Sequence, residues 1–144
     1  MVQSGTRAGV TWPTPRGSAA AGNRADDLEE YPARFDGVVA VAAVDDDDRA
    51  APFTSDGDWI DLAAPGVELL GPYPDGGWAG WSGTSMAAPL VSGQAALLRS
   101  LAPSKSAHDI VDLIDETTVE VTRAGSAIGV GRIDVAASIA AAAP

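Results

Sequence analysis

The sequence of 144 residues contains no cysteine and a single histidine. Without thiols the chain can form neither disulfide bonds nor a cysteine-ligated zinc site, and thiolate catalysis is excluded. One imidazole also excludes a metal site built from several histidines. Thiol redox chemistry and multi-histidine metal centres are therefore not functions of these residues.

Basic residues and long apolar runs are also scarce. The chain has 9 lysine and arginine residues against 20 acidic ones, which gives a net charge of −11. Because such a surface repels phosphate groups, we expect no nucleic acid and no membrane among its partners. The longest apolar runs fall far short of the ~18 residues that a membrane helix needs. The start, MVQSGTRAGVTWPTPRG, also lacks the apolar stretch of a secretory signal peptide.

Two segments differ in character at the N-terminal side. Residues 1–19 include Pro13, Pro15 and Gly17, and we expect an irregular segment that does not resemble a native strand. Residues 37–44 form a continuous run of eight small and β-branched apolar residues. A run of this kind predicts a strand that is buried on both faces, as in a parallel sheet. We therefore expect residues 20–144 to form the folded part, with a sheet at its centre.

The remaining pattern predicts short strands followed by helices. Strands are expected at residues 59–62, 67–70 and 78–81, and helices at 85–101, 107–115 and 135–142, with Ser106 and Asp134 as caps. Apolar side chains surround the whole circumference of the helix at 85–101, which predicts burial on every side. The alternation of strands and helices favours an α/β fold.

The run Gly83-Thr84-Ser85-Met86-Ala87-Ala88-Pro89 is the strongest chemical signal in the chain. It places Ser85 at the start of a helix, beside free backbone N–H groups and the positive end of the helix dipole. Such an environment stabilises an oxyanion that develops next to the serine. A serine that only caps a buried helix would give the same local pattern.

Taken as a whole, the run resembles the nucleophile motif of the subtilisin-like serine proteases. Further segments resemble that family in the same order along the chain. The segment Ala20-Ala21-Gly22-Asn23 resembles the oxyanion asparagine motif, and Tyr31-Pro32-Ala33 resembles the loop that lines the primary specificity pocket. Residues 38–44, 52–57, 61–66 and 129–135 continue the resemblance, which covers about residues 20–142.

The resemblance implies the C-terminal half of a subtilisin-like α/β fold with a parallel sheet and three layers. It implies a serine endopeptidase that acts on polypeptides, with Ser85 as nucleophile and Asn23 in the oxyanion hole. It assigns substrate contacts to Ala21, Gly22, Tyr31, Pro32, Ala33, Gly83 and Thr84. It also implies an extracellular location and Ca²⁺ as a cofactor of the family. No residue matches a calcium site, because Asp45–Asp48 lack the spacing of an EF-hand and Asp56, Asp58 and Asp61 are expected to form a surface cluster.

Two members of the family's catalytic triad are missing. The family places its Asp and His before the oxyanion asparagine, whereas the 22 residues before Asn23 contain no Asp, Glu or His. The one histidine, His108, lies at the start of a predicted helix and is expected to face solvent. We therefore expect the chain alone to be inactive. It is then either a truncated, non-catalytic binding module, which could self-associate, or half of a split enzyme whose partner supplies Asp and His.

Overall fold

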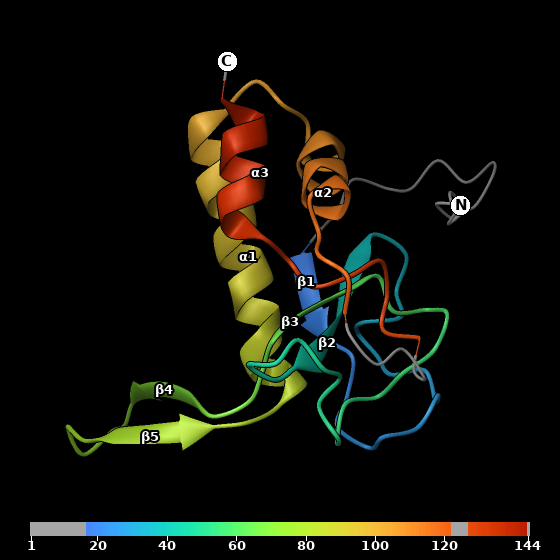
Figure 1. Cartoon of the computed structure of the whole chain (residues 1–144), viewed down its shortest axis with the longest axis vertical. Coiled ribbons are helices and arrows are strands. Elements are labelled where there is room, and N and C mark those ends of the chain that lie inside the picture. Colours follow the sequence, from blue (N-terminus) through green and yellow to red (C-terminus); the bar gives the residue numbers. More distant parts are fainter. Residues whose placement is uncertain (1–16, 122–126, 144) are drawn as a thin grey trace.

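The computed structural model describes residues 17–121 and 127–143 of the chain (Figure 1). This part of the chain forms a three-stranded sheet and a separate two-stranded hairpin, which are followed by three helices. The combination confirms the expected α/β class. The elements are β1 (Gly17–Ala20), β2 (Val38–Val44), β3 (Leu62–Pro65), β4 (Leu69–Pro72), β5 (Trp78–Trp81), α1 (Thr84–Leu101), α2 (Ala107–Glu116) and α3 (Val135–Ala142).

The central strand β2 is buried on both faces, as its apolar run predicts. It pairs in parallel with β1 on one side and β3 on the other. Val39, Val41 and Ala43 pack into one apolar core, which α1 and α2 complete. The intervening residues of β2 pack into a second core on the opposite face, formed with loop residues that include Ala33 and Trp59. The three layers of the chain are thus helices, sheet and loops.

The first strand corrects the expectation for the N-terminal segment. Irregular structure was expected through residue 19, but β1 begins at Gly17 and pairs with Val38 of β2. Its small side chains fit against α1, where Ser18 Oγ donates to Ala88 O at 2.9 Å and lies 2.8 Å from Ser92 Oγ. Pro13 and Pro15, which argued against a strand, lie outside the described residues.

Helix α1 packs across all three strands of the sheet, with α2 and α3 beside it (Figure 1). The expectation that it is buried on every side is wrong for one face. Leu90, Leu97 and Leu101 are 39%, 49% and 56% exposed, because no element within residues 17–121 and 127–143 covers that side. On the covered side, the buried Gln94 donates to Ser138 Oγ at 2.7 Å and joins α1 to α3.

The helix caps follow the sequence closely. Ser106 and Asp109 form the reciprocal hydrogen bonds of a capping box at the start of α2. Asp134 accepts a hydrogen bond from Ala137 N–H at 2.9 Å at the start of α3. Each cap satisfies backbone donors that a helix leaves free in its first turn.

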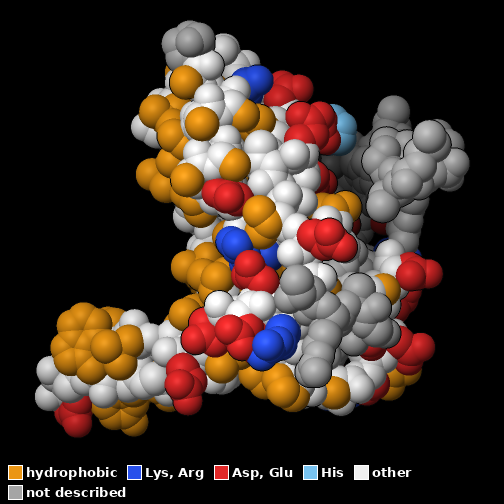
Figure 2. Space-filling model, in the orientation of Figure 1, with side chains coloured by type: hydrophobic (Ala, Val, Ile, Leu, Met, Phe, Trp, Pro, Cys, Tyr) orange, Lys and Arg blue, Asp and Glu red, His pale blue; other side chains and the backbone are white. Residues whose placement is uncertain are grey.

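Two of the expected strands are displaced along the chain. β3 begins at Leu62 rather than residue 59, because Trp59 is buried in a turn and donates from Nε1 to Asp27 O at 3.3 Å. β4 begins at Leu69, where it pairs antiparallel with β5. This hairpin projects from the rest of the molecule, and hydrophobic side chains gather on it (Figure 2).

In the described part of the chain, no helix combines the length and the apolar character that a membrane span requires.

Candidate active site

Ser85 lies in the first turn of α1 and its side chain is exposed. Gly83, two residues before Ser85, caps the helix, and its carbonyl accepts from Met86 N–H at 2.9 Å. A Cβ added to Gly83 would lie 3.3 Å from Asn23 Nδ2. The glycine therefore lets the asparagine side chain approach the start of the helix closely.

Asn23 and Thr84 fix each other at the helix start. Asn23 Oδ1 accepts from Thr84 N–H at 2.9 Å and from Thr84 Oγ1 at 3.0 Å. Thr84 Oγ1 in turn accepts from Gly22 N–H at 3.1 Å, and Thr84 is fully buried. Because a backbone N–H can only donate, these bonds determine which atom of the Asn23 amide is the oxygen.

Two hydrogen-bond donors are available at the start of α1: the side-chain nitrogen of Asn23, Nδ2, and the backbone N–H of Ser85. Within the described chain, Asn23 Nδ2 has no hydrogen-bond acceptor, and the Asn23 residue is exposed. The N–H of Ser85 lies in the first helical turn, where the helix provides no acceptor. An anionic oxygen placed between these donors would also lie at the positive end of the α1 dipole. The arrangement can therefore bind a developing oxyanion.

The segment that carries Asn23 is anchored on both sides. Ala21 N–H donates to Val41 O at 2.9 Å, which extends the pairing of β1 with β2. Gly22 O accepts from Ser55 N–H at 2.9 Å, and Ser55 is fully buried. Sequence reasoning assigned no role to Ser55 beyond its segment, because only the folded chain brings residues 22 and 55 together.

The loop at residues 31–33 lies beside this segment rather than against Ser85. Ala33 is buried in the same core as Ala21. Tyr31 is 63% exposed and its ring meets Phe35 edge-on, with centroids 4.7 Å apart. Phe35 N–H donates to Pro32 O at 3.0 Å within the same loop. The structure thus brings Ala21, Gly22, Gly83 and Thr84 together beside Asn23, and no hydrogen bond or ring contact in the described chain joins Tyr31 or Pro32 to Ser85.

A carboxylate that sequence reasoning missed lies against the same segment. A Cβ added to Gly22 would lie 2.8 Å from Glu30 Cδ and 2.9 Å from Ser55 Oγ. Glu30 Oε1 is 3.1 Å from Arg24 Nε. No signal in the sequence separates Glu30 from its acidic neighbours Asp26, Asp27 and Glu29, because its position depends on how the loop folds back.

In the described part of the chain, the one histidine pairs within its own helix and not with Ser85. His108 is exposed on α2, and its Nε2 lies 3.7 Å from Asp112 Oδ2 one turn along the same helix. This confirms the expectation of a solvent-facing residue. Within residues 17–121 and 127–143, neither an imidazole nor a carboxylate forms a hydrogen bond with Ser85, so this part of the chain offers its hydroxyl no general base.

The acidic run after β2 is engaged partly within its own turn and partly by Arg132. Asp45 Oδ1 accepts from the N–H groups of Asp47 at 3.0 Å and Arg49 at 2.9 Å, and Arg132 pairs with Asp48. Asp61 Oδ2 accepts from Ala40 N–H at 2.7 Å. In the described chain no three acidic or histidine side chains are grouped to hold a metal ion.

Asp115 is the carboxyl group most strongly affected by its surroundings. Burial is the largest cause that raises its pKa, and together with the negative charges of Asp61, Asp112 and Glu116 it brings the pKa to about 7. Its buried Oδ1 has no hydrogen-bond partner among the described residues. The sequence shows Asp115 only as one of several acidic residues on a helix, so its burial could not be predicted.

A serine at the start of a helix that packs on a parallel sheet, beside an asparagine amide fixed at the same helix start, is the kind of arrangement with which serine hydrolases stabilise an oxyanion. The comparison with protein families identifies the family to which the chain belongs. The model of the Subtilase family matches residues 18–131, and the chain belongs to this family of serine proteases.

Characterised relatives agree with this assignment. The chain is 37% identical to thermitase of Thermoactinomyces vulgaris over 134 residues, which are 91% of this chain and 47% of thermitase. It is 40% identical to the thermophilic serine proteinase of Bacillus sp. (strain AK1) over 81% of the chain and 28% of that protein. It is 36% identical to the halolysin-like extracellular serine protease Nep of Natrialba magadii over 81% of the chain and 21% of that protein.

Solved structures show the same partial match. The prenylagaramide maturation protease PagA superimposes with a TM-score of 0.80 at 30% identity, over 88% of this chain and 50% of that one. A protease from Pseudoalteromonas arctica PAMC 21717 gives a TM-score of 0.81 at 33% identity, over 86% and 42% of the two chains. The chain thus spans half or less of each of these relatives.

Proposed function

We propose that the chain supplies the nucleophile and the oxyanion hole of a serine endopeptidase that hydrolyses polypeptides. The observation that supports this most directly is the pair of hydrogen bonds from Thr84 to Asn23 Oδ1. They turn the Asn23 amide so that Nδ2 is available beside Ser85. A serine that merely capped the helix would not require this arrangement.

In the proposed reaction, Ser85 Oγ attacks the carbonyl carbon of a peptide bond. The negative charge that forms on the carbonyl oxygen is stabilised by Ser85 N–H and Asn23 Nδ2. The first turn of α1 adds its dipole to this stabilisation. In subtilisin itself, a member of this family, loss of the oxyanion asparagine lowers kcat by ~10²–10³.

The attack also requires a base, which we place outside these 144 residues. An unassisted serine hydroxyl is a weak nucleophile near neutral pH. A histidine must accept its proton and later donate it to the leaving amine, and an aspartate must orient that histidine. We therefore propose that additional polypeptide, either a preceding segment or a separate chain, supplies both residues.

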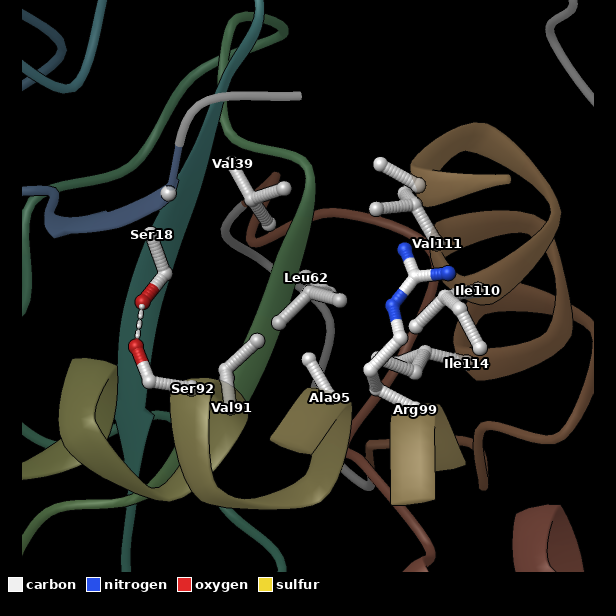
Figure 3. A pocket seen from close by; sticks show the side chains of 12 residues that line it. Ser18, Val39, Leu62, Val91, Ser92, Ala95, Arg99, Ile110, Val111 and Ile114 are labelled. Atoms are coloured by element: carbon white, nitrogen blue, oxygen red, sulfur yellow. Dashed lines mark hydrogen bonds between the residues drawn. The ribbon is translucent and has the colours of Figure 1, made fainter. Parts of the chain in front are cut away.

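A groove between the sheet and two helices is the proposed docking site for that polypeptide. It encloses about 260 Å³. In Figure 3, Val39 and Leu62 of the sheet face Val91 of α1 and Ile110 of α2 across this space. Ser18, Ser92 and Arg99 add polar groups at its rim. A strand or helix with apolar side chains would fill the groove and bury these residues.

The open edge of the sheet lies at the same place. β3 is already covered, since Ala63 N–H donates to Gly131 O at 2.8 Å and Ala63 O accepts from Ile133 N–H at 2.9 Å. β1 ends the order β1-β2-β3 on the other side. A strand added in parallel to β1 would pair its backbone groups and place further side chains over the groove. The chain matches only 47% of thermitase, which leaves enough polypeptide in a complete domain to do so.

We also propose that the complete protease works outside the cell. The support is the relative from Natrialba magadii, which is described as an extracellular protease. The chain's charge of −11 suits a protein that remains dispersed in an aqueous medium.

A chimeric protein tests the proposed function. The part of thermitase that precedes the matched region is joined to residues 17–144 of this chain, and peptide hydrolysis is measured together with the thermal melting curve. We expect a cooperative melt and activity that Ser85→Ala abolishes. Ser100→Ala is the matched control, because Ser100 is an exposed serine near the other end of the same helix.

The alternative is a non-catalytic binding module. A chimera that melts cooperatively but hydrolyses no peptide would support this alternative and contradict the role of Ser85. Peptide hydrolysis that persists in the Ser85→Ala variant would also contradict the proposed role of Ser85.

A further inference from the structure

We propose that the polypeptide that docks in the groove between the sheet, α1 and α2 places an aspartate or glutamate side chain against Arg99, just before the apolar residues that enter the groove. The inference deepens the proposed function and rests on its docking site. It names the chemistry and the residue order of the partner segment. Three observations carry it: the position of Arg99, the absence of an ion pair for it among the described residues, and the direction of α1 relative to β1.

Arg99 lies at the rim of the groove, whose walls are apolar side chains of the sheet, α1 and α2. Figure 3 shows the Arg99 side chain extending from α1 toward Ile110 and Val111 of α2. Its Nη1 donates to Lys105 O, in the segment that joins the two helices. This bond holds the guanidinium at the groove, so the arginine has less side-chain freedom to lose when a ligand binds.

Within residues 17–121 and 127–143, Arg99 forms no ion pair. The other arginines of this part each pair with an aspartate or a glutamate: Arg24, Arg34, Arg49 and Arg132. A guanidinium has five N–H donors, so the bond to Lys105 O leaves others that can bind a carboxylate. The groove is thus complementary to a ligand that combines apolar side chains with one negative charge.

The direction of α1 determines where that charge belongs in the partner segment. Ser18 Oγ in β1 lies 2.8 Å from Ser92 Oγ, whereas Gly22, just after β1, donates from its N–H to Thr84 Oγ1 at 3.1 Å. Later residues of the strand therefore face earlier residues of α1, and the two elements run in opposite directions. Arg99 follows Ser92 and lies beyond the start of β1. A segment that runs parallel to β1 passes Arg99 first, so its acidic residue precedes its apolar ones.

The length of the groove limits the partner segment to a few residues. Val91 and Arg99 both line it, and at ~1.5 Å per residue they lie roughly 12 Å apart along α1. An extended chain covers this distance in about four residues. Residues 1–16 contain no aspartate or glutamate, so they do not supply the carboxylate. We therefore assign the segment to the additional polypeptide that also supplies the base.

The purely structural alternative is that Arg99 serves only the end of α1. A positive charge in the last turn favours a helix, and the bond to Lys105 O ties the helix to the next segment. That alternative predicts no dependence of ligand binding on the ligand's charge. The inference predicts a preference for a negative charge that disappears with the Arg99 guanidinium, so ligand binding separates the two.

The test uses the complete 144-residue chain labelled with ¹⁵N. It is titrated with acetyl-Glu-Val-Ala-Val-amide and with acetyl-Gln-Val-Ala-Val-amide, which have the same shape and differ in charge. The amide signals of Val91 and Ile110, which line the groove, report binding. We expect the glutamate peptide to bind roughly two- to fivefold more tightly, as for one exposed ion pair, and less so at high salt. The reversed peptide, acetyl-Val-Ala-Val-Glu-amide, should bind no better than the glutamine peptide.

Two variants of Arg99 decide the cause. Arg99→Gln should remove the preference, and Arg99→Glu should reverse it in favour of acetyl-Lys-Val-Ala-Val-amide. Arg49→Gln is the matched control, because Arg49 is an exposed arginine outside the groove, and it should keep the preference. Arg99 is itself exposed, so melting curves of its variants should match that of the natural chain.

Equal binding of the glutamate and glutamine peptides, a preference that survives in Arg99→Gln, or no response of Val91 and Ile110 to any peptide would overturn the inference. Self-association that Arg99→Gln abolishes in light scattering, without any peptide preference, would identify a second copy as the occupant and overturn it as well. None of these results depends on Ser85 chemistry. An inactive folded chimera would contradict the proposed function, whereas equal peptide binding would leave the role of Ser85 standing.

Discussion

Asn23 and Thr84 lie 61 residues apart in the sequence, yet both hydrogen bonds that Thr84 can donate end on the side-chain oxygen of Asn23. The link joins the end of β1 to the start of α1. It holds the Asn23 amide in one orientation before any substrate arrives, and preorganised donors of this kind stabilise a transition state without reorganising during the reaction.

The first prediction concerns the Thr84 hydroxyl. Thr84→Val keeps the shape of the side chain but leaves the half-buried Gly22 N–H without its acceptor. We expect a loss of about 1–3 kcal/mol in the free energy of unfolding, measured by urea denaturation of the chimera. We also expect a lower kcat, because the Asn23 amide is no longer held by two bonds. Unchanged stability and kcat would show that the hydroxyl does not position Asn23.

The second prediction concerns Gly129, which lies against Asp61 and Leu62 at the start of β3. Its φ is +88°, and a Cβ there would lie 2.2 Å from Asp61 O. Gly129→Ala should therefore destabilise the chain by about 2–4 kcal/mol, since both backbone conformation and space oppose a side chain. The control is Gly93→Ala in α1, where a Cβ meets no atom within 4 Å. That variant should be stabilised by roughly 0.5–1 kcal/mol, because alanine favours a helix. Equal effects of the two variants in urea denaturation would contradict the packing described at Gly129.

The third prediction concerns the pH dependence of stability. Asp115 has a pKa of about 7 in the folded chain against an ordinary value of 3.8, so between these values the folded state holds a proton that the unfolded state releases. Stability from this group is therefore complete at low pH and is lost as pH rises to about 7, by at most ~1.4 kcal/mol per pH unit.

The variant Asp115→Asn should flatten this slope and be more stable than the natural chain at pH 8. Urea denaturation at a series of pH values measures the effect. The matched control, Asp46→Asn on an exposed turn, should keep the slope. A slope unaffected by Asp115→Asn would show that the carboxyl group is not buried as described.

The fourth prediction concerns the isolated chain in solution. The apolar groove and the exposed leucines of α1 should cause it to self-associate or to unfold in part. Leu97→Asn should reduce the apparent mass in light scattering, because Leu97 is 49% exposed and little packing is lost. Ser100→Asn, on the same helix, should change nothing. A natural chain that is a compact monomer with a sharp melt would contradict this prediction.

Much of the fold could be predicted because it depends on local pattern. The apolar run at 38–44 gave a strand buried on both faces, and Ser106 and Asp134 gave two helix caps. The start of β3 could not be predicted, because Trp59 leaves the strand to donate to a carbonyl 32 residues earlier. Likewise, the exposed face of α1 depends on what surrounds the helix rather than on its own residues.

The site divides in the same way. Ser85 and Asn23 could be chosen from motifs, since each lies in a short characteristic run. The positions of Glu30 and Ser55 could not, because both depend on the chain folding back against Gly22. Asp115 was missed for the same reason, as its burial comes from the packing of α2 and not from the helix sequence.

The most direct test of the account is the reaction of Ser85 with a fluorophosphonate, followed by mass spectrometry. We predict that the 144-residue chain alone labels slowly, and that the folded chimera labels rapidly and with one equivalent at Ser85. Asn23→Ala should slow the chimera's labelling, since the reagent also develops an anionic oxygen. Rapid labelling of the chain alone would contradict the proposal that the base lies outside these 144 residues. A folded chimera that does not label at Ser85 would contradict the central claim, that Ser85 is the nucleophile.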